Sequence, residues 1–315
     1  MPPRKCKGCS KTFPYRQSLH RHRKRCKGGG ADIDTKYVGK IKENVTDIDT
    51  PKSKYVWKSK ENVKNHCFLL PRDVRMLVIG KSGFGKTTFV TSLLLEPEMM
   101  DYNTLHICGR SLHQPEYQIM RHSFSNNLSK NQTRTIFENQ DLLSELYENP
   151  EDYINSYNNG MGGIDANVYE DTAEILDPSR YDKSLKHLIV FDDIMIGPQN
   201  KVEAFFTRAR HNNTDVIYIA QSYFYLPRRT VRENANVLVF FRQDNKNLSH
   251  IYTDHCSIDG ISFEDFKNFC ADVWNESKHN FITIDLSRPW YCGKYRKNLN
   301  DYWIPQNNVS TYQQY

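Results

Sequence analysis

The sequence lacks the features of a secreted or membrane-spanning protein. No apolar run approaches the roughly 20 residues that a membrane-spanning helix needs, and no apolar signal region follows Met1. Eight cysteines in 315 residues are too few for the dense disulfide scaffold of a small secreted domain. We therefore expect an intracellular chain with no membrane span, kept in a reducing compartment.

Acidic residues are absent from the first 30 positions, which hold ten lysines and arginines. The rest of the chain carries 33 basic and 37 acidic residues, so the formal net charge of +6 becomes −4 there. The positive charge therefore belongs to the N-terminal segment. It predicts a polyanionic partner for that segment alone.

Three cysteines of this basic segment have metal-ligand spacing. With Phe13 and Leu19 as its two apolar positions, the segment resembles a Cys2His2 zinc finger in which a cysteine replaces the last histidine. Two cysteines on a hairpin and two ligands one helical turn apart can close a tetrahedral Zn²⁺ site. His20 and His22 compete for the third position, and the spacing favours His22. The expected zinc ligands are Cys6, Cys9, His22 and Cys26.

Residues 1–27 would then form a small ββα zinc finger. Contact with DNA, contact with protein and a nuclear-localisation signal over residues 21–27 all agree with its charge. Residues 28–66 begin with three glycines and contain a partly duplicated segment, in which 32–45 recurs within 47–63. Two copies are too few for a repeat fold, so we expect a flexible linker.

The most informative stretch begins at residue 74. A short apolar run enters a loop that matches G-x-x-x-x-G-K-[ST], and an apolar helical pattern follows it. This is the context of a phosphate-binding loop, because inward-pointing backbone N–H groups and a helix N-terminus attract phosphates. Lys86 would reach the β- and γ-phosphates, and Thr87 would bind Mg²⁺. The expected nucleotide-binding residues are Gly80, Lys81, Ser82, Gly83, Phe84, Gly85, Lys86, Thr87 and Thr88.

A second apolar run, residues 187–191, ends in two aspartates. Such a run is typical of a buried parallel strand whose carboxyl end meets a nucleotide. Asp192 would belong to the Mg²⁺ shell, and Asp193 would polarise the water that attacks ATP. A further strand, 215–220, ends at Gln221. We expect this side chain between the two motif strands, where it can sense the γ-phosphate.

The other patterns predict an α/β domain over residues 67–290, with a mostly parallel sheet flanked by helices. Further strands are expected at 104–108, 133–137, 237–241 and 281–285, and helices at 86–95, 201–210 and after Ser262. Residues 139–180 are acidic and rich in asparagine and tyrosine, which predicts a partly disordered insertion. Residues 291–315 are expected to lie over the domain as a tail.

The segment from Arg210 to Asn236 carries a resemblance to a known family. It begins Arg-His-Asn-Asn-Thr-Asp and continues, after a strand, as Gln-Ser-Tyr-Phe-Tyr-Leu-Pro-Arg-Arg-Thr-Val-Arg-Glu-Asn-Ala-Asn. Together with residues 80–88 and 188–193, it resembles the genome-packaging ATPases of the FtsK-HerA superfamily. The nearest likeness is to the branch found in poxviruses, virophages and Maverick/Polinton elements, and it covers roughly residues 70–290.

This resemblance implies a RecA-like P-loop domain of the ASCE class and a homo-oligomeric ring. ATP hydrolysis with Mg²⁺ would drive double-stranded DNA into a capsid, with capsid proteins as partners and the virion or the host nucleus or cytoplasm as location. Lys86, Asp193 and Gln221 would be catalytic, as would Arg210 as an arginine finger reaching a neighbouring subunit. Arg232 is the second choice for that finger. Asp193 stands where the superfamily commonly has the longer glutamate.

Two other functions remain open for the same residues. One is a helicase or DNA translocase that serves replication or transposition. The other is a zinc-finger DNA-binding regulator in which ATP only switches conformation, and Asp193 and Gln221 argue against it because a switch has less need of hydrolytic groups. A GTPase is disfavoured, since the stretch from Asn245 to Leu248 lacks the aspartate of an Asn-Lys-x-Asp motif.

Overall fold

The computed structural model describes residues 4–5, 12–13, 66–139, 154 and 162–305. The chain divides into two compact units, Met1–Asn62 and Val63–Tyr315. In the first unit, β1 (Arg4–Lys5) and β2 (Thr12–Phe13) pair antiparallel. The four expected zinc ligands, Cys6, Cys9, His22 and Cys26, lie outside the described residues, as does the linker up to residue 65.

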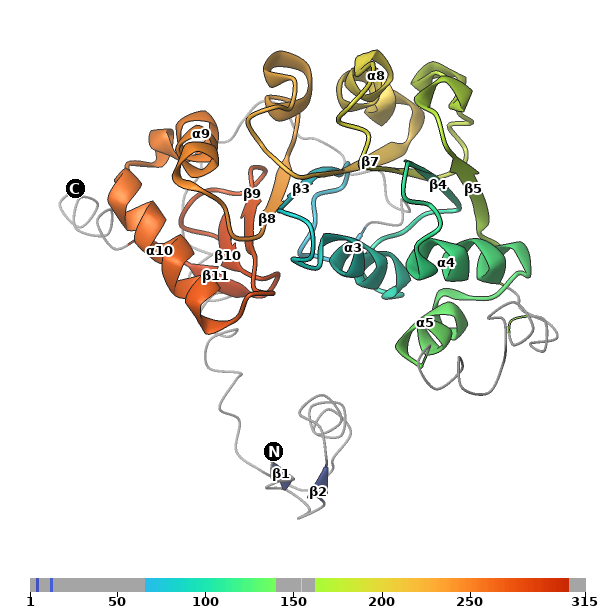
Figure 1. Ribbon diagram of the computed structural model, residues 1–315, viewed down its shortest axis with the longest axis horizontal. Helices are drawn as coiled ribbons and strands as arrows, with labels where there is room; N and C mark the ends of the chain where they lie inside the picture. Colours follow the sequence, from blue (N-terminus) through green and yellow to red (C-terminus); the bar gives the residue numbers. More distant parts are fainter. Residues whose placement is uncertain (1–3, 6–11, 14–65, 140–153, 155–161, 306–315) are drawn as a thin grey trace, which may run out of the picture. The chain divides into compact units, whose positions relative to one another are not determined.

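The second unit is built on a sheet in which nine described strands follow the order β11-β10-β9-β8-β3-β7-β6-β4-β5 (Figure 1). The strands are β3 (Arg75–Ile79), β4 (Thr104–Gly109), β5 (Asp165–Tyr169), β6 (His187–Asp192), β7 (Thr214–Ala220), β8 (Val237–Phe240), β9 (Ile282–Asp285), β10 (Tyr295–Lys297) and β11 (Asp301–Trp303). The strands from β8 to β5 pair in parallel. The last three strands are added antiparallel. The expected α/β fold with a largely parallel sheet is confirmed.

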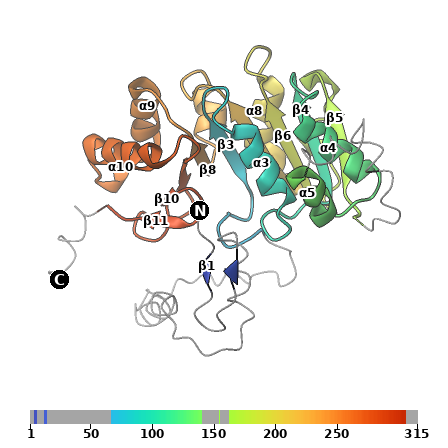
Figure 2. The ribbon, with the colours of Figure 1, turned by 60° about the horizontal axis from the view of Figure 1, so that its bottom comes forward.

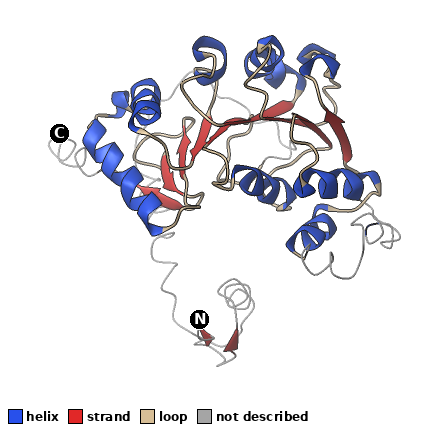
Figure 3. Ribbon diagram, viewed as in Figure 1, coloured by secondary structure: helices blue, strands red, loops and turns tan. Residues whose placement is uncertain are grey.

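Helices cover both faces of this sheet (Figure 3). One face packs α3 (Lys86–Leu95), α4 (Pro115–Ser125) and α5 (Lys130–Glu138), and the other packs α8 (Asn200–Arg208), α9 (Asn245–His255) and α10 (Phe263–Glu276). Short helices at η1 (Thr172–Glu174), η2 (Pro178–Arg180), η3 (Ala209–Asn212), η4 (Arg228–Arg232) and η5 (Ser257–Asp259) join these elements. Within the described ranges, each helix is too short or too polar to span a bilayer.

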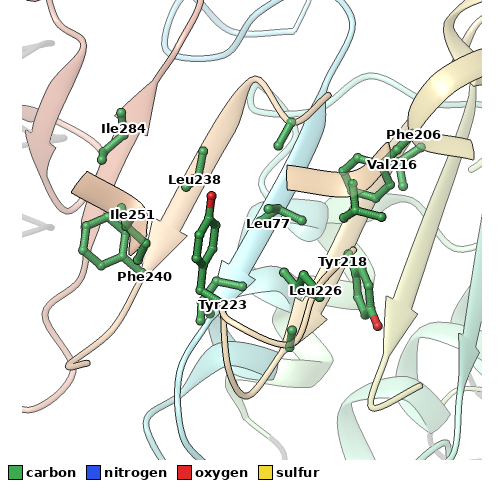
Figure 4. Close-up of a cluster of buried hydrophobic side chains, with 14 of the residues drawn as sticks. Leu77, Phe206, Val216, Tyr218, Tyr223, Leu226, Leu238, Phe240, Ile251 and Ile284 are labelled. Carbon is green, nitrogen blue, oxygen red and sulfur yellow. The ribbon is translucent and has the colours of Figure 1, made fainter. Parts of the chain in front are cut away.

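The central strands are buried on both faces, which explains their continuous apolar sequences. In β3, Met76 and Val78 belong to the core on one face, whereas Leu77 and Ile79 belong to the core on the other. Figure 4 shows part of the second core, where Leu77 lies among side chains of β7, β8 and the turn after β7. This double burial holds the carboxyl ends of β3, β7 and β6 side by side.

One local expectation differs from the structure. The strand expected at 133–137 is wrong, because these residues belong to α5. The Ser129 side chain accepts a hydrogen bond from the Gln132 backbone N–H, and the Gln132 side chain accepts one from the Ser129 backbone N–H. This capping box starts a helix there. The expected start of α10 is correct: Ser262 is its N-cap and accepts from the Asp265 backbone N–H.

The expected insertion at 139–180 is ordered over its described part. Residues 165–169 form β5, which extends the sheet beyond β4. Two apolar residues near it, Ile164 and Ile175, are buried. The low apolar content therefore marks an edge of the sheet rather than a segment without a core. Residues 140–153 and 155–161 lie outside the described residues.

The limits of the domain are also wider than expected. The last residue assigned to the linker, His66, is buried, and its ring nitrogen lies 2.7 Å from a carboxylate oxygen of Asp215 on β7. At the other end, β10 and β11 continue the sheet instead of forming a tail after residue 290. Short strands with charged residues gave no clear apolar pattern, which is why the sequence did not indicate them.

Candidate nucleotide-binding site

The loop between β3 and α3 has a backbone that requires its glycines. Gly83 (φ 77°) and Gly85 (φ 90°) are left-handed, a region that glycine enters without a steric penalty. Gly85 is also the N-cap of α3, where no side chain caps the helix, and the first turn carries no acidic residue. The N-terminal N–H groups of α3 and the positive end of its dipole are therefore available to an anion.

A cavity of about 290 Å³ lies where this loop meets the carboxyl ends of β6 and β7. Because β7 lies between β3 and β6, Gln221 at its end stands between the two motif strands. The strand order thus collects most of the residues expected to act on the nucleotide in one place; the exceptions, which do not line the cavity, are Gly80, Lys81, Phe84 and Arg210. The lining residues are Ser82, Gly83, Gly85, Lys86, Thr87, Thr88, Ser111, Gln114, Glu116, Asp192, Asp193, Ile219, Ala220 and Gln221.

Lys86 lies over the loop that precedes it. Its ammonium Nζ donates to the carbonyl oxygen of Lys81 at 3.0 Å. Burial lowers the pKa of Lys86, and the nearby carboxylates of Asp192 and Asp193 oppose that shift. The cation and the two acids are thus close enough to influence each other within one pocket.

Asp192 is held by a tyrosine that the sequence motifs do not include. Its carboxylate is 6% exposed, and Oδ2 accepts the Tyr117 hydroxyl at 2.5 Å. Burial raises the pKa of Asp192, whereas the Tyr117 hydrogen bond and the Lys86 charge lower it. The side chain of Thr87 lies close enough to the same hydroxyl to influence the pKa of Tyr117. One phenol therefore lies near both residues expected to bind Mg²⁺.

These two residues fit a magnesium ion. A threonine hydroxyl and a carboxylate are hard oxygen ligands, which Mg²⁺ prefers in a shell completed by water and substrate phosphates. A buried carboxylate whose pKa is raised by desolvation gains most from a nearby cation. Among the residues that the structure describes, no group of three or more histidine, cysteine, aspartate or glutamate side chains could hold a metal by itself.

The Asp193 carboxylate points in a different direction from the Asp192 carboxylate, because the backbone turns sharply after β6. Its φ of 53° is left-handed, a conformation that aspartate tolerates better than most residues. The Gln221 amide Nε2 donates to Asp193 Oδ1 at 3.3 Å. The second carboxylate therefore faces the end of β7, while the first is held by Tyr117.

Comparisons with known proteins give only a distant likeness. No family model matches the sequence, and no curated protein matches it. The genome-packaging NTPase B204 from Sulfolobus turreted icosahedral virus 2, with sulfate bound, is similar over 75% of this chain and 100% of its own, at 12% identity and a TM-score of 0.44. VirB4 of Thermoanaerobacter pseudethanolicus is similar over 74% of this chain and 90% of its own, at 11% identity and a TM-score of 0.38. Function therefore has to be argued from this chain's own residues.

Arg210 lies before the amino end of β7, whereas the pocket lies at the carboxyl end of that strand. It is exposed in η3, just before β7 begins. The seven residues of β7 separate it from Gln221, which is about 23 Å at ~3.3 Å per residue. The Arg210 guanidinium cannot reach the pocket of its own subunit.

Arg232, the second choice for an arginine finger, is engaged inside the domain. It is 7% exposed, and its Nη1 lies 3.0 Å from Asp254 Oδ2. Its guanidinium also lies 5.0 Å from the ring centroid of Tyr223. An Arg232 side chain that left this pair would leave the buried Asp254 carboxylate without its main counter-charge. Arg210 is therefore the better candidate for the arginine finger.

Proposed function

We propose that residues 66–305 form a RecA-like ATPase that moves double-stranded DNA and packages the genome of a virus or virus-like element into a capsid. The observation that carries the hydrolytic part is the convergence of Lys86, Thr87, Asp192, Asp193 and Gln221 on one cavity. These five side chains, from the start of α3 and the carboxyl ends of the neighbouring strands β6 and β7, support a hydrolytic site rather than a simple anion-binding loop.

Binding would begin at the loop. Backbone N–H groups of the loop and the start of α3 receive the phosphates, and Lys86 places its charge on the β- and γ-phosphates. Thr87 and Asp192 would hold Mg²⁺, which neutralises charge on the phosphates when it is bound. Tyr117 orients Asp192 and, by donating a hydrogen bond, favours its ionised form.

Hydrolysis would depend on the second aspartate. Asp193 accepts a hydrogen bond or proton from the attacking water, and Gln221 holds the Asp193 carboxylate by its amide. Since that amide is at the end of β7, it can also respond to the presence of the γ-phosphate. Asp193 and Gln221 therefore favour turnover over a passive ATP switch.

The assembly would be a ring in which Arg210 acts on the next subunit. Its exposure and its position opposite the pocket support action across an interface, where guanidinium stabilises charge on the transferring phosphoryl group. The packaging role rests on the resemblance of residues 210–236 to packaging ATPases. A translocase for replication or transposition would use the same site.

The N-terminal unit would add a zinc-binding module that contacts DNA or protein. The strands β1 and β2 pair antiparallel, which agrees with the two strands of a ββα zinc module. The purified chain should contain one zinc per molecule, measured by atomic absorption. Exchange of Cys6 and Cys9 for serine should remove it, and a wild-type chain without zinc would refute this module.

Steady-state ATP hydrolysis by the full chain, with and without linear double-stranded DNA, tests the main proposal. We expect DNA to stimulate turnover and Lys86→Ala to abolish it. Asp193→Asn should lower kcat by about 100-fold or more while ATP binding, measured with a fluorescent analogue, stays within about twofold. Asparagine tolerates the left-handed backbone of residue 193, so this variant removes only the charge.

Lys183→Ala is a matched control, because this lysine is exposed and is not among the residues that line the pocket. Turnover that persists in Lys86→Ala would refute the site. ATP turnover that DNA does not stimulate would agree with an ATPase site but would refute the proposed DNA motor.

A further inference from the structure

A second cavity lies between α10 and β11, away from the nucleotide pocket. Its volume is about 530 Å³, and it shares no lining residue with the nucleotide pocket. In the strand order, β8, β9 and β10 separate β11 from the loop-bearing strand β3. Figures 1 and 2 show α10 beside β10 and β11. This groove is therefore a separate site from the nucleotide pocket.

One wall of the groove is an edge of the sheet. Among the described strands, β11 is the last in the order, so one side of its backbone has no neighbouring strand. Unpaired N–H and C=O groups along an edge can pair with another extended chain. A peptide that adds to such an edge beside a helix is a recurring mode of recognition.

The floor of the groove is apolar. Phe269 of α10 stacks on Trp303 of β11, with ring centroids 4.2 Å apart and an angle of 7° between the rings. Along the same strand and just after it, Tyr302 and Ile304 are 47% and 46% exposed. Aromatic and aliphatic surface of this kind can receive side chains of an added strand.

The walls of the groove are acidic. The side chains of Asp272 and Asp301 are exposed. The single lysine of the lining, Lys297, is paired with Glu276. The charged lining residues are Asp265, Asp272, Glu276, Asp301 and Lys297. Four carboxylates against one ammonium repel nucleic acid and attract cationic side chains.

We propose that this groove binds an extended, lysine- or arginine-rich peptide of a partner protein, which adds to β11 as a further strand. Edge pairing supplies the backbone hydrogen bonds, the Phe269–Trp303 stack receives apolar side chains, and the carboxylates select cationic ones. The site is independent of ATP hydrolysis, because its residues lie outside the nucleotide pocket.

Fluorescence anisotropy with a labelled peptide of alternating lysine and valine tests this proposal on the full chain. We expect binding that is at least about tenfold tighter than for the matching glutamate–valine peptide. A lysine–valine peptide that is N-methylated at alternate residues should bind about tenfold more weakly, because it lacks strand-pairing N–H donors. Equal binding of the lysine–valine and glutamate–valine peptides would overturn the proposal. Equal binding of the methylated and unmethylated lysine–valine peptides would also overturn it.

Variants locate the binding to the groove. Asp272→Lys should weaken the lysine–valine peptide by roughly fivefold or more, since it replaces attraction with repulsion. Glu264→Lys is the control: it makes the same charge change on α10 but lies outside the groove. Equal effects of the two variants would show a diffuse charge effect and refute the groove. A change in self-association with Asp272→Lys, seen by ultracentrifugation, would assign the groove to a second copy and also overturn the proposal.

Discussion

Tyr117 is the residue that most changes the description of the pocket. It comes from α4, donates its hydroxyl hydrogen bond to Asp192 of β6 and lies near Thr87 of α3. Desolvation raises the pKa of the Asp192 carboxylate, and the hydrogen bond from Tyr117 opposes this. The tyrosine therefore helps to keep a buried acid ionised for a cation.

Replacement of this tyrosine gives a pH-dependent prediction. In Tyr117→Phe the pKa of Asp192 rises further, because a bond to the ionised form is lost. The ionised acid is then lost at higher pH, so the acid limb of the profile of kcat/KM for ATP moves to higher pH. At neutral pH we expect kcat/KM to fall about tenfold.

Tyr252→Phe is the control, since its hydroxyl also makes an internal bond, to the Ile261 carbonyl, but lies outside the pocket. An acid limb that stays in place in Tyr117→Phe, with normal folding, would contradict the assigned role of the Tyr117 hydroxyl.

The sequence indicated most pocket residues because they lie in or directly after short motifs. The loop from Gly80, the pair Asp192 and Asp193, and Gln221 each end an apolar strand, and such strands meet at one edge of a parallel sheet. Tyr117 follows no such strand directly. Its approach to Asp192 depends on β4 lying next to β6, a pairing that no local pattern encodes.

Among the elements, β10 shows how a charged segment can belong to the core. Arg296 is fully buried, and its Nη2 lies 2.6 Å from Asp285 Oδ2 on β9. Its Nη1 also donates to the Leu69 carbonyl oxygen at 2.7 Å. One guanidinium thus joins β10, β9 and the entry to the domain.

Loss of this guanidinium should destabilise the whole unit. Arg296→Met removes the fully buried one of the two arginines that contact Asp285, and breaking such a buried pair costs about 3–5 kcal/mol. Arg288→Met is a matched control, because Arg288 contacts the same carboxylate at 3.0 Å from a more exposed position; it should cost about 1 kcal/mol or less. Urea unfolding followed by circular dichroism measures both. Similar costs for the two variants would contradict the structural role of Arg296.

The same elements show where sequence patterns lose information. The strands β3, β6, β7 and β8 are fully buried apart from Arg75, so their apolar runs are visible without context. By contrast, β5 is exposed or half-buried along its length. At the C-terminal edge, β10 and β11 have three residues each. Tertiary pairing, rather than composition, makes strands of these segments.

At the scale of the whole molecule, the length of β7 separates the pocket from Arg210. The pocket lies at the carboxyl end of β7 and Arg210 lies before its amino end. If Arg210 completes a neighbour's site, each subunit offers a pocket at one end and an arginine at the other. The contact is then head-to-tail, and such contacts close into rings when the rotation permits.

Mixtures of subunits test this arrangement. Arg210→Ala chains mixed with wild type should lower ATP turnover more than in proportion to their fraction, because each variant also disables a neighbour. The control is Arg208→Ala, an exposed arginine at the same end that pairs with Asp177 at the surface. Mixtures in which turnover follows simple dilution would count against an arginine supplied in trans.

If Arg210 completes a neighbour's site, its separation from the pocket also makes catalysis depend on the contacts between subunits rather than on each chain alone. A closed ring would contain as many complete sites as subunits, whereas an assembly opened at one contact would contain one fewer. The terminal subunits would then differ, since one keeps an arginine with no site to serve and the other keeps a site with no arginine. Turnover per subunit would therefore report whether the ring is closed, and opening it to admit DNA would silence a single site.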